Sequence, residues 1–265
     1  MKSTGTVKAA AEIGRYAKGS ATVISLQNGV TNPDVLRRLL SRQQVVHGMV
    51  PYNVVHTGPG RWYRATGGEL VVDDQEVMRD LAARIGDRPG RLLLSKDMQG
   101  VAWGKLLFNL NNAINALSGT TYLAELKQRD FRQVFAAAII ETLALLRKAG
   151  IRPGKIGKVG PDLLPHVIGS PDFIFNNLFL KVQKIDPKGR GSMADDFDAG
   201  RPTEIDYLNG EVVRLAESLG ETAPVNAAIV ELVKQAELGV QRTWGARQLR
   251  DHILGGHRKV KGFGY

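Results

Sequence analysis

A lysine and two asparagines recur at helical spacing in an otherwise apolar segment, residues 103–117. Lys105, Asn109 and Asn112 fall within a narrow stripe when successive residues are about 100° apart. The other faces of this segment carry mainly Leu, Phe, Ile and Ala. A buried ammonium costs free energy unless it is paired or faces a cleft, so the stripe indicates the polar wall of a ligand pocket.

An alternative interpretation is that this stripe faces solvent, as one side of many helices does. A solvent-facing stripe accommodates a lysine easily. It favours Glu, Arg and Gln beside that lysine, however, whereas asparagine is a poor helix former. The pattern therefore favours the pocket wall over the solvent-facing stripe.

A second set of polar residues lies in the C-terminal half. Ser192 follows Gly191, and Thr203 and Glu204 open the run Thr-Glu-Ile-Asp-Tyr-Leu-Asn-Gly. Thr203 can cap a helix over residues 204–219, and Glu204 would then lie in its first turn, where the helix dipole favours a carboxylate. Taken alone, Glu204 is simply an acid at a helix start, and Asn28 before a glycine is simply a turn.

Other catalytic patterns fail on their context. Residues 189–194 fit the spacing G-x-G-x-x-G/A, but they follow a proline-containing loop rather than a strand, and residues 58–60 lack the third small residue. The five histidines show no metal-ligand spacing, and there is no G-x-S-x-G element. Cysteine is absent, which excludes disulfides, thiolate metal sites and cysteine nucleophiles. We expect no metal site.

The 265-residue chain has a net charge of +10, from 36 Lys and Arg against 26 Asp and Glu. Such a surplus can attract nucleic acid or a small anionic substrate. Most basic residues are scattered among acids, and only residues 242–261 concentrate them, without interleaved aromatics for base stacking. We expect a solvated basic tail and no nucleic-acid partner. No apolar run approaches the length of a membrane span or a signal peptide, which predicts a cytoplasmic protein without a membrane partner.

Strand and helix patterns alternate through the first third of the sequence. Strands are predicted at 21–26, 44–51 and 91–95, with a strand or hairpin over 61–72, and helices at 32–40 and 73–85. After residue 97 the pattern is helical, with segments at 101–117, 131–149, 162–167, 172–182, 204–219 and 223–238. We therefore predict an α/β part over 1–97, a helical part over 98–240 and the basic tail over 241–265.

Several short segments, taken in order and spacing, resemble the ketopantoate (2-dehydropantoate 2-) reductase family. They are residues 26–29, 105–109, 192–193, 203–210 and 224–226. The likeness extends from residue 1 to about 238. It implies a Rossmann-type NADP-binding sheet followed by an all-α substrate and dimerisation domain. It also implies reduction of a 2-oxo acid by NADPH, most simply of ketopantoate to pantoate in pantothenate biosynthesis.

The resemblance also implies a role for each matching residue. Lys105 resembles the catalytic lysine that donates a hydrogen bond and then a proton to the ketone oxygen. Asn109 resembles an asparagine that holds the substrate, and Ser192 the hydroxyl that contacts the substrate carboxylate. Glu204 resembles the carboxylate that orients substrate or cofactor ribose and keeps the lysine protonated. Asn28 resembles the residue beside the nicotinamide.

The sequence departs from the family pattern in two respects. Family members often carry a further asparagine eight residues after the lysine, where this chain has Ala113, and Asn112 is our candidate substitute. The family also opens with a strand, a G-x-G-x-x-G turn and a helix, none of which occurs in these 265 residues. We therefore expect a sheet truncated at its N-terminus that binds NADPH weakly and reduces ketopantoate poorly.

Two hypotheses remain open at this point. The first is an oxidoreductase that acts on a small anionic 2-oxo acid. The second is a catalytically impaired fragment, a helical domain that binds the substrate or dimerises without turnover. A homodimer is a candidate assembly under either hypothesis.

Overall fold

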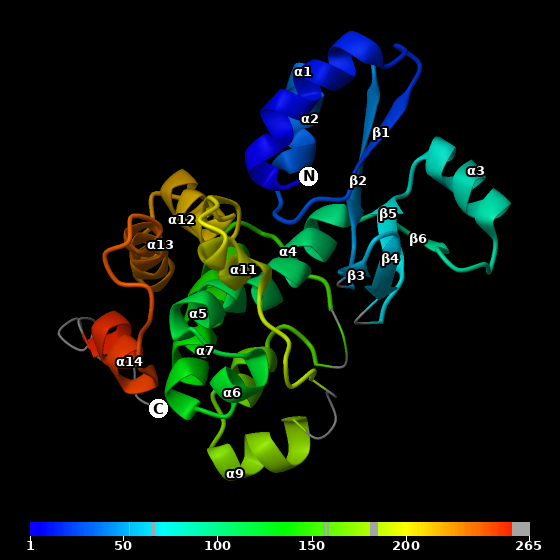
Figure 1. Ribbon diagram of the computed structural model, residues 1–265. Coiled ribbons are helices and arrows are strands. Elements are labelled where there is room, and N and C mark those ends of the chain that lie inside the picture. The colour runs from blue at the N-terminus through cyan, green and yellow to red at the C-terminus, as the bar shows by residue number, and fades with distance from the viewer. Residues whose placement is uncertain (53, 65–66, 156, 158, 181–184, 256–265) are drawn as a thin grey trace. The chain divides into compact units, whose positions relative to one another are not determined.

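The computed structural model describes the chain except for residues 53, 65–66, 156, 158, 181–184 and 256–265. It contains two compact units, Met1–Lys105 and Leu106–Tyr265 (Figure 1). All strands of the described residues lie in the first unit, and the second is helical. This confirms the predicted order of an α/β part followed by a helical part.

The first unit is built on a four-stranded sheet in the order β1-β2-β5-β6. Its strands are β1 (Thr22–Ser25), β2 (Gln44–Met49), β5 (Leu70–Asp73) and β6 (Leu92–Ser95). β1 runs parallel to β2 and β5 parallel to β6, whereas β2 and β5 are antiparallel. Residues 61–72 form neither one strand nor a hairpin of their own, because β4 (Arg61–Arg64) pairs with β3 (Val54–Gly58) in a separate hairpin and β5 pairs with β2 and β6.

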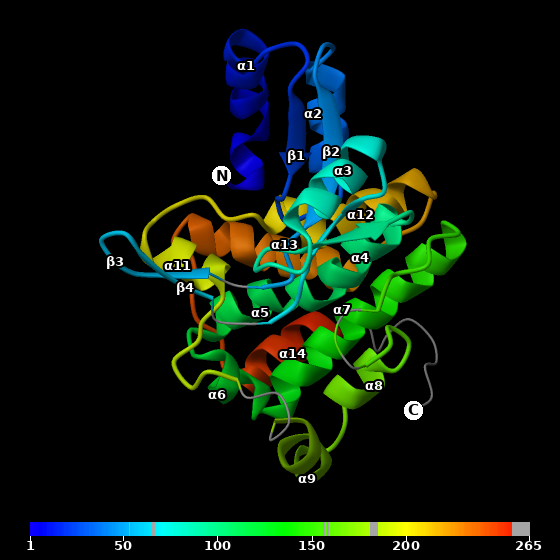
Figure 2. The ribbon, with the colours of Figure 1, turned by 90° about the vertical axis from the view of Figure 1, so that its right-hand side faces the viewer.

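Helices cover both faces of this sheet because neighbouring residues of a strand point to opposite sides. Val45 packs in the cluster that includes helices α1 (Thr6–Tyr16) and α2 (Asn32–Leu39). The next residue, Val46, packs with Met78 of α3 (Glu76–Ile85). Figures 1 and 2 show α1 and α2 beside β1 and β2, and Figure 1 shows α3 beside β5 and β6. The unit is thus a three-layer α/β sandwich.

The second unit is a helical bundle around α7 (Arg129–Lys148), whose buried residues include Ile139 and Leu146. Its other elements are α5 (Asn111–Ser118), α6 (Tyr122–Leu126), α8 (Leu164–Ile168), α9 (Asp172–Ile174), the π-helical η2 (Phe175–Leu180), α11 (Ser192–Asp198), η3 (Ile205–Tyr207), α12 (Asn209–Ser218), α13 (Pro224–Glu237) and α14 (Ala246–Gly255). Helices α5, α6, α8, α12, α13 and α14 all pack against α7 (Figure 2).

Three expectations from the sequence need correction. The helix predicted over 101–117 is two helices, α4 (Met98–Asn109) and α5, which meet at Leu110. The helix predicted from residue 204 begins only at Asn209. The basic tail is not simply solvated, because residues 246–255 form α14, which buries Leu249 and Ile253 against the bundle. The rest of that tail, 256–265, lies outside the described residues.

No helix among the described residues combines the length and the apolar composition that crossing a bilayer requires. The longest, α7, carries several charged residues along its length.

Candidate active site

Lys105 is fixed at the carboxyl ends of two parallel strands of the first unit. Its Nζ donates to Asn28 Oδ1 at 2.9 Å and to the backbone oxygen of Val50 at 2.5 Å. Asn28 follows the end of β1, and Val50 follows the end of β2. Ligands of open α/β sheets bind outside the carboxyl ends of the strands. The structure therefore brings an ammonium and a side-chain amide together where such a sheet binds its ligands.

The turn that carries Asn28 is held by a buried hydrogen-bond network. The backbone oxygen of Asn28 accepts from Asn32 Nδ2 at 2.6 Å and from Ser3 Oγ at 3.1 Å. Asn32 is buried and its Oδ1 accepts from Thr6 Oγ1 at 2.8 Å, which ties the turn to the start of α1. Gly29 follows with φ 87°, a conformation that favours glycine. The sequence Asn-Gly is thus a turn, and the turn holds Asn28 beside Lys105.

The residues of the predicted polar stripe are divided between two helices, with Lys105 and Asn109 on α4 and Asn112 on α5. Lys105, Asn109 and Asn112 are each partly exposed, whereas Leu106 and Leu107 are buried. Lys105 and Asn109 lie one turn apart on α4. The roles assigned to these residues stay predictions.

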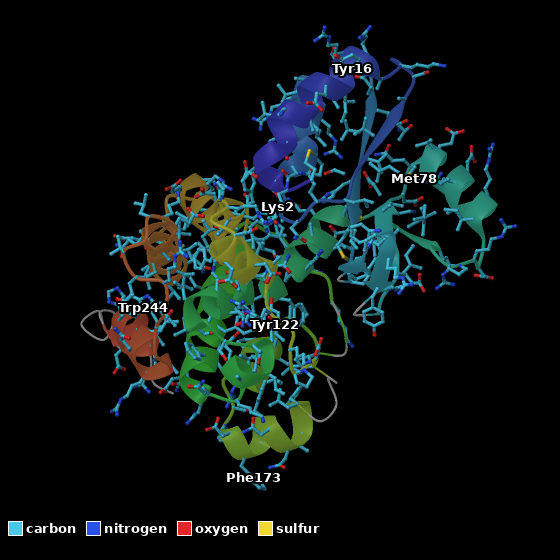
Figure 3. The ribbon with its side chains drawn as sticks, viewed as in Figure 1. Lys2, Tyr16, Met78, Tyr122, Phe173 and Trp244 are labelled. Atoms are coloured by element: carbon cyan, nitrogen blue, oxygen red, sulfur yellow. The ribbon has the colours of Figure 1, made fainter. Side chains whose placement is uncertain are left out.

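In the second unit, the turn before Ser192 is joined to Asn112 through Tyr122. The Tyr122 hydroxyl donates to Asn112 Oδ1 at 2.9 Å, and its backbone N–H donates to the Gly189 oxygen at 2.9 Å. Figure 3 labels Tyr122 beside α5 and α6. Burial raises the pKa of the Tyr122 hydroxyl, which keeps it a donor. Ser192, the first residue of α11, is exposed and therefore accessible to a ligand.

Glu204 is buried, with 7% of its surface exposed, and it precedes η3 rather than opening an α-helix. Thr203 Oγ1 accepts the Ile205 N–H at 3.2 Å, across Glu204, which is itself the N-cap residue of η3. Thr203 was predicted to cap an α-helix over residues 204–219, and that prediction is wrong, because the α-helix begins only at Asn209. The placement of Glu204 relative to Lys105 involves both units and stays a prediction.

Three residues near these positions were missed in the sequence. Asn115 and Glu125 are fully buried and hydrogen-bonded to each other, and Tyr122 bridges Asn112 and the turn before Ser192. An asparagine in a helix and an acid near a helix start carry no pattern that distinguishes a buried pair from two surface residues. No group of three or more His, Cys, Asp or Glu that could hold a metal ion occurs in the described part of the chain.

Family comparisons assign this arrangement to a class of oxidoreductases. Residues 97–237 match the family model described as ketopantoate reductase PanE/ApbA C terminal, and residues 1–76 match that described as ketopantoate reductase PanE/ApbA. The chain therefore belongs to the ketopantoate reductase PanE/ApbA family, whose members use a nicotinamide cofactor. The predicted family and the predicted fold, a Rossmann-like sheet followed by a helical domain, are both confirmed.

The curated relatives that the chain matches are distant in sequence. The 2-dehydropantoate 2-reductase of Pyrobaculum aerophilum is 28% identical over 225 residues, which cover 84% of this chain and 71% of the relative. The enzyme of the same name from Halobacterium salinarum is 25% identical over 243 residues, which cover 89% of this chain and 74% of the relative.

Solved structures give the same fold. A PanE/ApbA family ketopantoate reductase from Ralstonia eutropha JMP134 superposes with a TM-score of 0.76 at 29% identity, covering 91% of this chain and 74% of that one. A D-mandelate dehydrogenase, solved with NADH and anilino(oxo)acetate, superposes with a TM-score of 0.74 at 19% identity. The match covers 91% of this chain and 75% of that one. The second likeness concerns the fold alone.

Proposed function

We propose that this chain reduces a 2-oxo acid with NADPH, and that its substrate is ketopantoate, which becomes pantoate. The observation that carries the proposal is the position of Lys105, held by Asn28 and Val50 at the carboxyl edge of β1 and β2. The names of the relatives, 2-dehydropantoate 2-reductases, support the choice of substrate. The net charge of +10 favours an anionic substrate.

The same edge fits the nicotinamide end of the cofactor, because its described side chains are an amide and an ammonium rather than carboxylates. NADPH, when bound, supplies the hydride for the ketone carbon. Asn28 would contact the cofactor beside its nicotinamide, and Glu204 would orient the substrate or the cofactor ribose. The D-mandelate dehydrogenase holds NADH, so NADH is the comparison cofactor in every assay below.

The residues of the chain would then act on the substrate as follows. Lys105 Nζ donates to the ketone oxygen and stabilises the negative charge that develops there as the carbon is reduced. It transfers one proton to that oxygen, which becomes the hydroxyl of the product, and solvent later restores the ammonium. Asn109 and Asn112 hold the substrate, and Ser192 contacts its carboxylate.

A second candidate function is binding without turnover. It is the alternative that the sequence left open, and the compact helical unit, residues 106–265, would carry it. Under this candidate the helical unit binds the 2-oxo acid or a second copy of the chain. A ketopantoate reductase from Staphylococcus aureus is described as dimeric, and light scattering would show whether this chain is.

Two measurements separate these candidates. NADPH and NADH are titrated against the folded protein by fluorescence, and oxidation of each is then followed with ketopantoate and with an aryl 2-oxo acid. The reductase proposal expects saturable NADPH binding and oxidation that Lys105→Met abolishes and the surface variant Lys148→Met preserves. Ketopantoate binding without oxidation of either cofactor would refute the reductase and support the second candidate.

A further inference from the structure

A buried polar cluster in the second unit links α5 and α6 to the turn before Ser192. Glu125 Oε2 accepts from Asn115 Nδ2 at 2.8 Å and from Asn111 Nδ2 at 3.3 Å. Neither Asn115 nor Glu125 has exposed surface, and Asn111 is also buried. Most buried polar groups in native proteins are hydrogen-bonded, and the carboxyl and two amides of this cluster bond to one another.

The cluster holds the backbone of the turn itself. Asn115 Oδ1 accepts the Gly191 N–H at 2.8 Å, across 76 residues of sequence. The Gly191 oxygen in turn accepts the N–H groups of Ala194 and Asp195, at 3.0 and 3.2 Å, and so starts α11. Gly191 therefore has its N–H fixed by α5 and its carbonyl fixed by the helix that begins with Ser192.

Glu125 determines which way the Asn115 amide points. A side-chain amide has one acceptor oxygen and one NH₂ donor group. Its Nδ2 here faces two acceptors, Glu125 Oε2 and the Thr120 oxygen at 3.1 Å. The oxygen is thereby directed to the Gly191 N–H, because the reversed amide would set oxygen against oxygen. Without Glu125, one of the two groups that enforce this orientation is lost.

Close packing at the same turn requires a glycine. A Cβ on Gly191 would lie 2.8 Å from the Tyr122 hydroxyl and 3.2 Å from Asn115 Oδ1. Both are closer than ordinary contacts allow, so a side chain here must displace the turn or Tyr122. Tyr122 also donates to Asn112, so the hydroxyl that packs over Gly191 also holds a candidate substrate-binding residue.

We propose that Asn115, oriented by Glu125, is a positioning residue that sets Ser192 for contact with the carboxylate of the substrate. The inference rests on the proposed function for the identity of that ligand. Asn115 and Glu125 themselves touch no substrate. They act through the Gly191 N–H, and the effect of losing them must therefore pass through Ser192.

Glu125 is uncharged at neutral pH, which fits its role of orienting the Asn115 amide. Burial raises the pKa of the Glu125 carboxyl to about 8, although the amides of Asn115 and Asn111 act in the opposite direction. Glu125 is then a neutral acid at neutral pH. Two buried acceptor atoms, Glu125 Oε1 and Asn111 Oδ1, have no hydrogen-bond partner in the described residues. A proton on Glu125 gives this acceptor-rich cluster one more donor, and glutamine at this position would do the same.

The test measures the turn and the kinetics separately. Asn115→Ala should accelerate amide exchange at Gly191 and raise KM for ketopantoate about tenfold, the size of one lost hydrogen bond, with kcat changed far less. Glu125→Gln should retain wild-type values for both. Asn226→Ala, which removes another fully buried amide of this unit, is the matched control and should leave exchange at Gly191 unchanged.

A double-mutant cycle asks whether Asn115 acts through Ser192. In a Ser192→Ala background, Asn115→Ala should raise KM no further, because the group that it positions is gone. Additive effects, or a wild-type KM in Asn115→Ala, would overturn the proposal. Should Asn115→Ala fail to fold, Gly191→Ala replaces it. The added methyl should raise KM in the same way, and Tyr122→Phe should partly restore it by removing the nearest atom.

The experiments distinguish failure of the proposed function from failure of this inference. If the wild-type chain neither oxidises NADPH with a 2-oxo acid nor binds ketopantoate, the reductase assignment fails. Exchange at Gly191 in Asn115→Ala still decides whether the cluster holds the turn. Unchanged exchange there would overturn the inference whatever the activity of the chain.

Discussion

Replacing Glu125 by glutamine should change how the stability of the protein depends on pH. Burial raises the pKa of this carboxyl from 4.5 to about 8 in the folded protein. The unfolded chain loses the proton near pH 4.5, whereas the folded chain keeps it until about pH 8. Between these values the folded state binds more protons, so the free energy of unfolding falls as pH rises. The neutral Glu125 carboxyl therefore stabilises the folded state at low pH, and this contribution is lost as pH rises. An ion-paired carboxylate, whose pKa is lowered, instead loses its contribution as pH falls.

The size of the effect follows from the shift in pKa. Each pH unit inside this window changes the free energy of unfolding by up to about 1.4 kcal/mol. The whole window therefore corresponds to about 5 kcal/mol, of which about 2 kcal/mol falls between pH 6 and pH 8. Glutamine has no proton to lose, and it keeps an acceptor for the amides of Asn111 and Asn115. Glu125→Gln should therefore be less sensitive to alkali than the wild type.

Urea denaturation at several values from pH 5 to pH 8 would measure this. The relevant quantity is the difference in unfolding free energy between Glu125→Gln and wild type, because every other titrating group cancels from it. That difference should increase steadily in favour of the variant as pH rises. Glu231→Gln, on the exposed side of α13, is the control and should give a flat difference. A flat difference for Glu125→Gln would refute the argument that its carboxyl is neutral in the folded state.

Three further outcomes follow from the same contacts. Lys105→Arg should lower kcat about 10²–10⁴-fold in the NADPH assay, because guanidinium keeps the charge but does not release a proton; near-normal kcat would exclude proton transfer from this residue. Arg132→Met should cost about 3–5 kcal/mol in urea denaturation. The reason is that Arg132 is fully buried and bonds two backbone carbonyls and a carboxylate. The control is Arg147→Met at an exposed ion pair, which should cost less than about 1 kcal/mol. Glu141→Ala should cost about 1–2 kcal/mol, because Glu141 accepts two backbone N–H groups at the start of α13; no loss would contradict that cap.

Most of the fold could be predicted because its signals are local. Short apolar runs such as residues 21–26 correspond to β1, and Pro33 marks the start of α2 within one residue. The antiparallel pairing of β2 with β5 could not be predicted, because it depends on contacts between distant residues. The helix over 246–255 was also missed. Most of its residues are polar or basic, and the apolar pattern is limited to the two residues that it buries, Leu249 and Ile253.

The candidate site was predictable only where residue types are unusual for their surroundings. A lysine in an apolar helix indicated Lys105, and its bonds to Asn28 and Val50 span 77 and 55 residues that no local pattern connects. Glu204 was placed in the wrong element, because the sequence does not show that a short 3-10 turn, residues 205–207, separates it from the α-helix that follows.

The asparagines of α4 and α5 divide into two groups, and this division limits what an asparagine in a helix can indicate. Asn109 and Asn112 are partly exposed, whereas Asn111 and Asn115 are buried and donate to Glu125. The asparagines of this segment therefore occupy two different environments. Asn115 satisfies both the Glu125 carboxyl group and the Gly191 N–H within one packed layer, and Asn111 adds a second donor to Glu125. An asparagine-rich helix thus predicts buried polar chemistry, and only the exposure of each residue shows whether it faces a ligand or the protein interior.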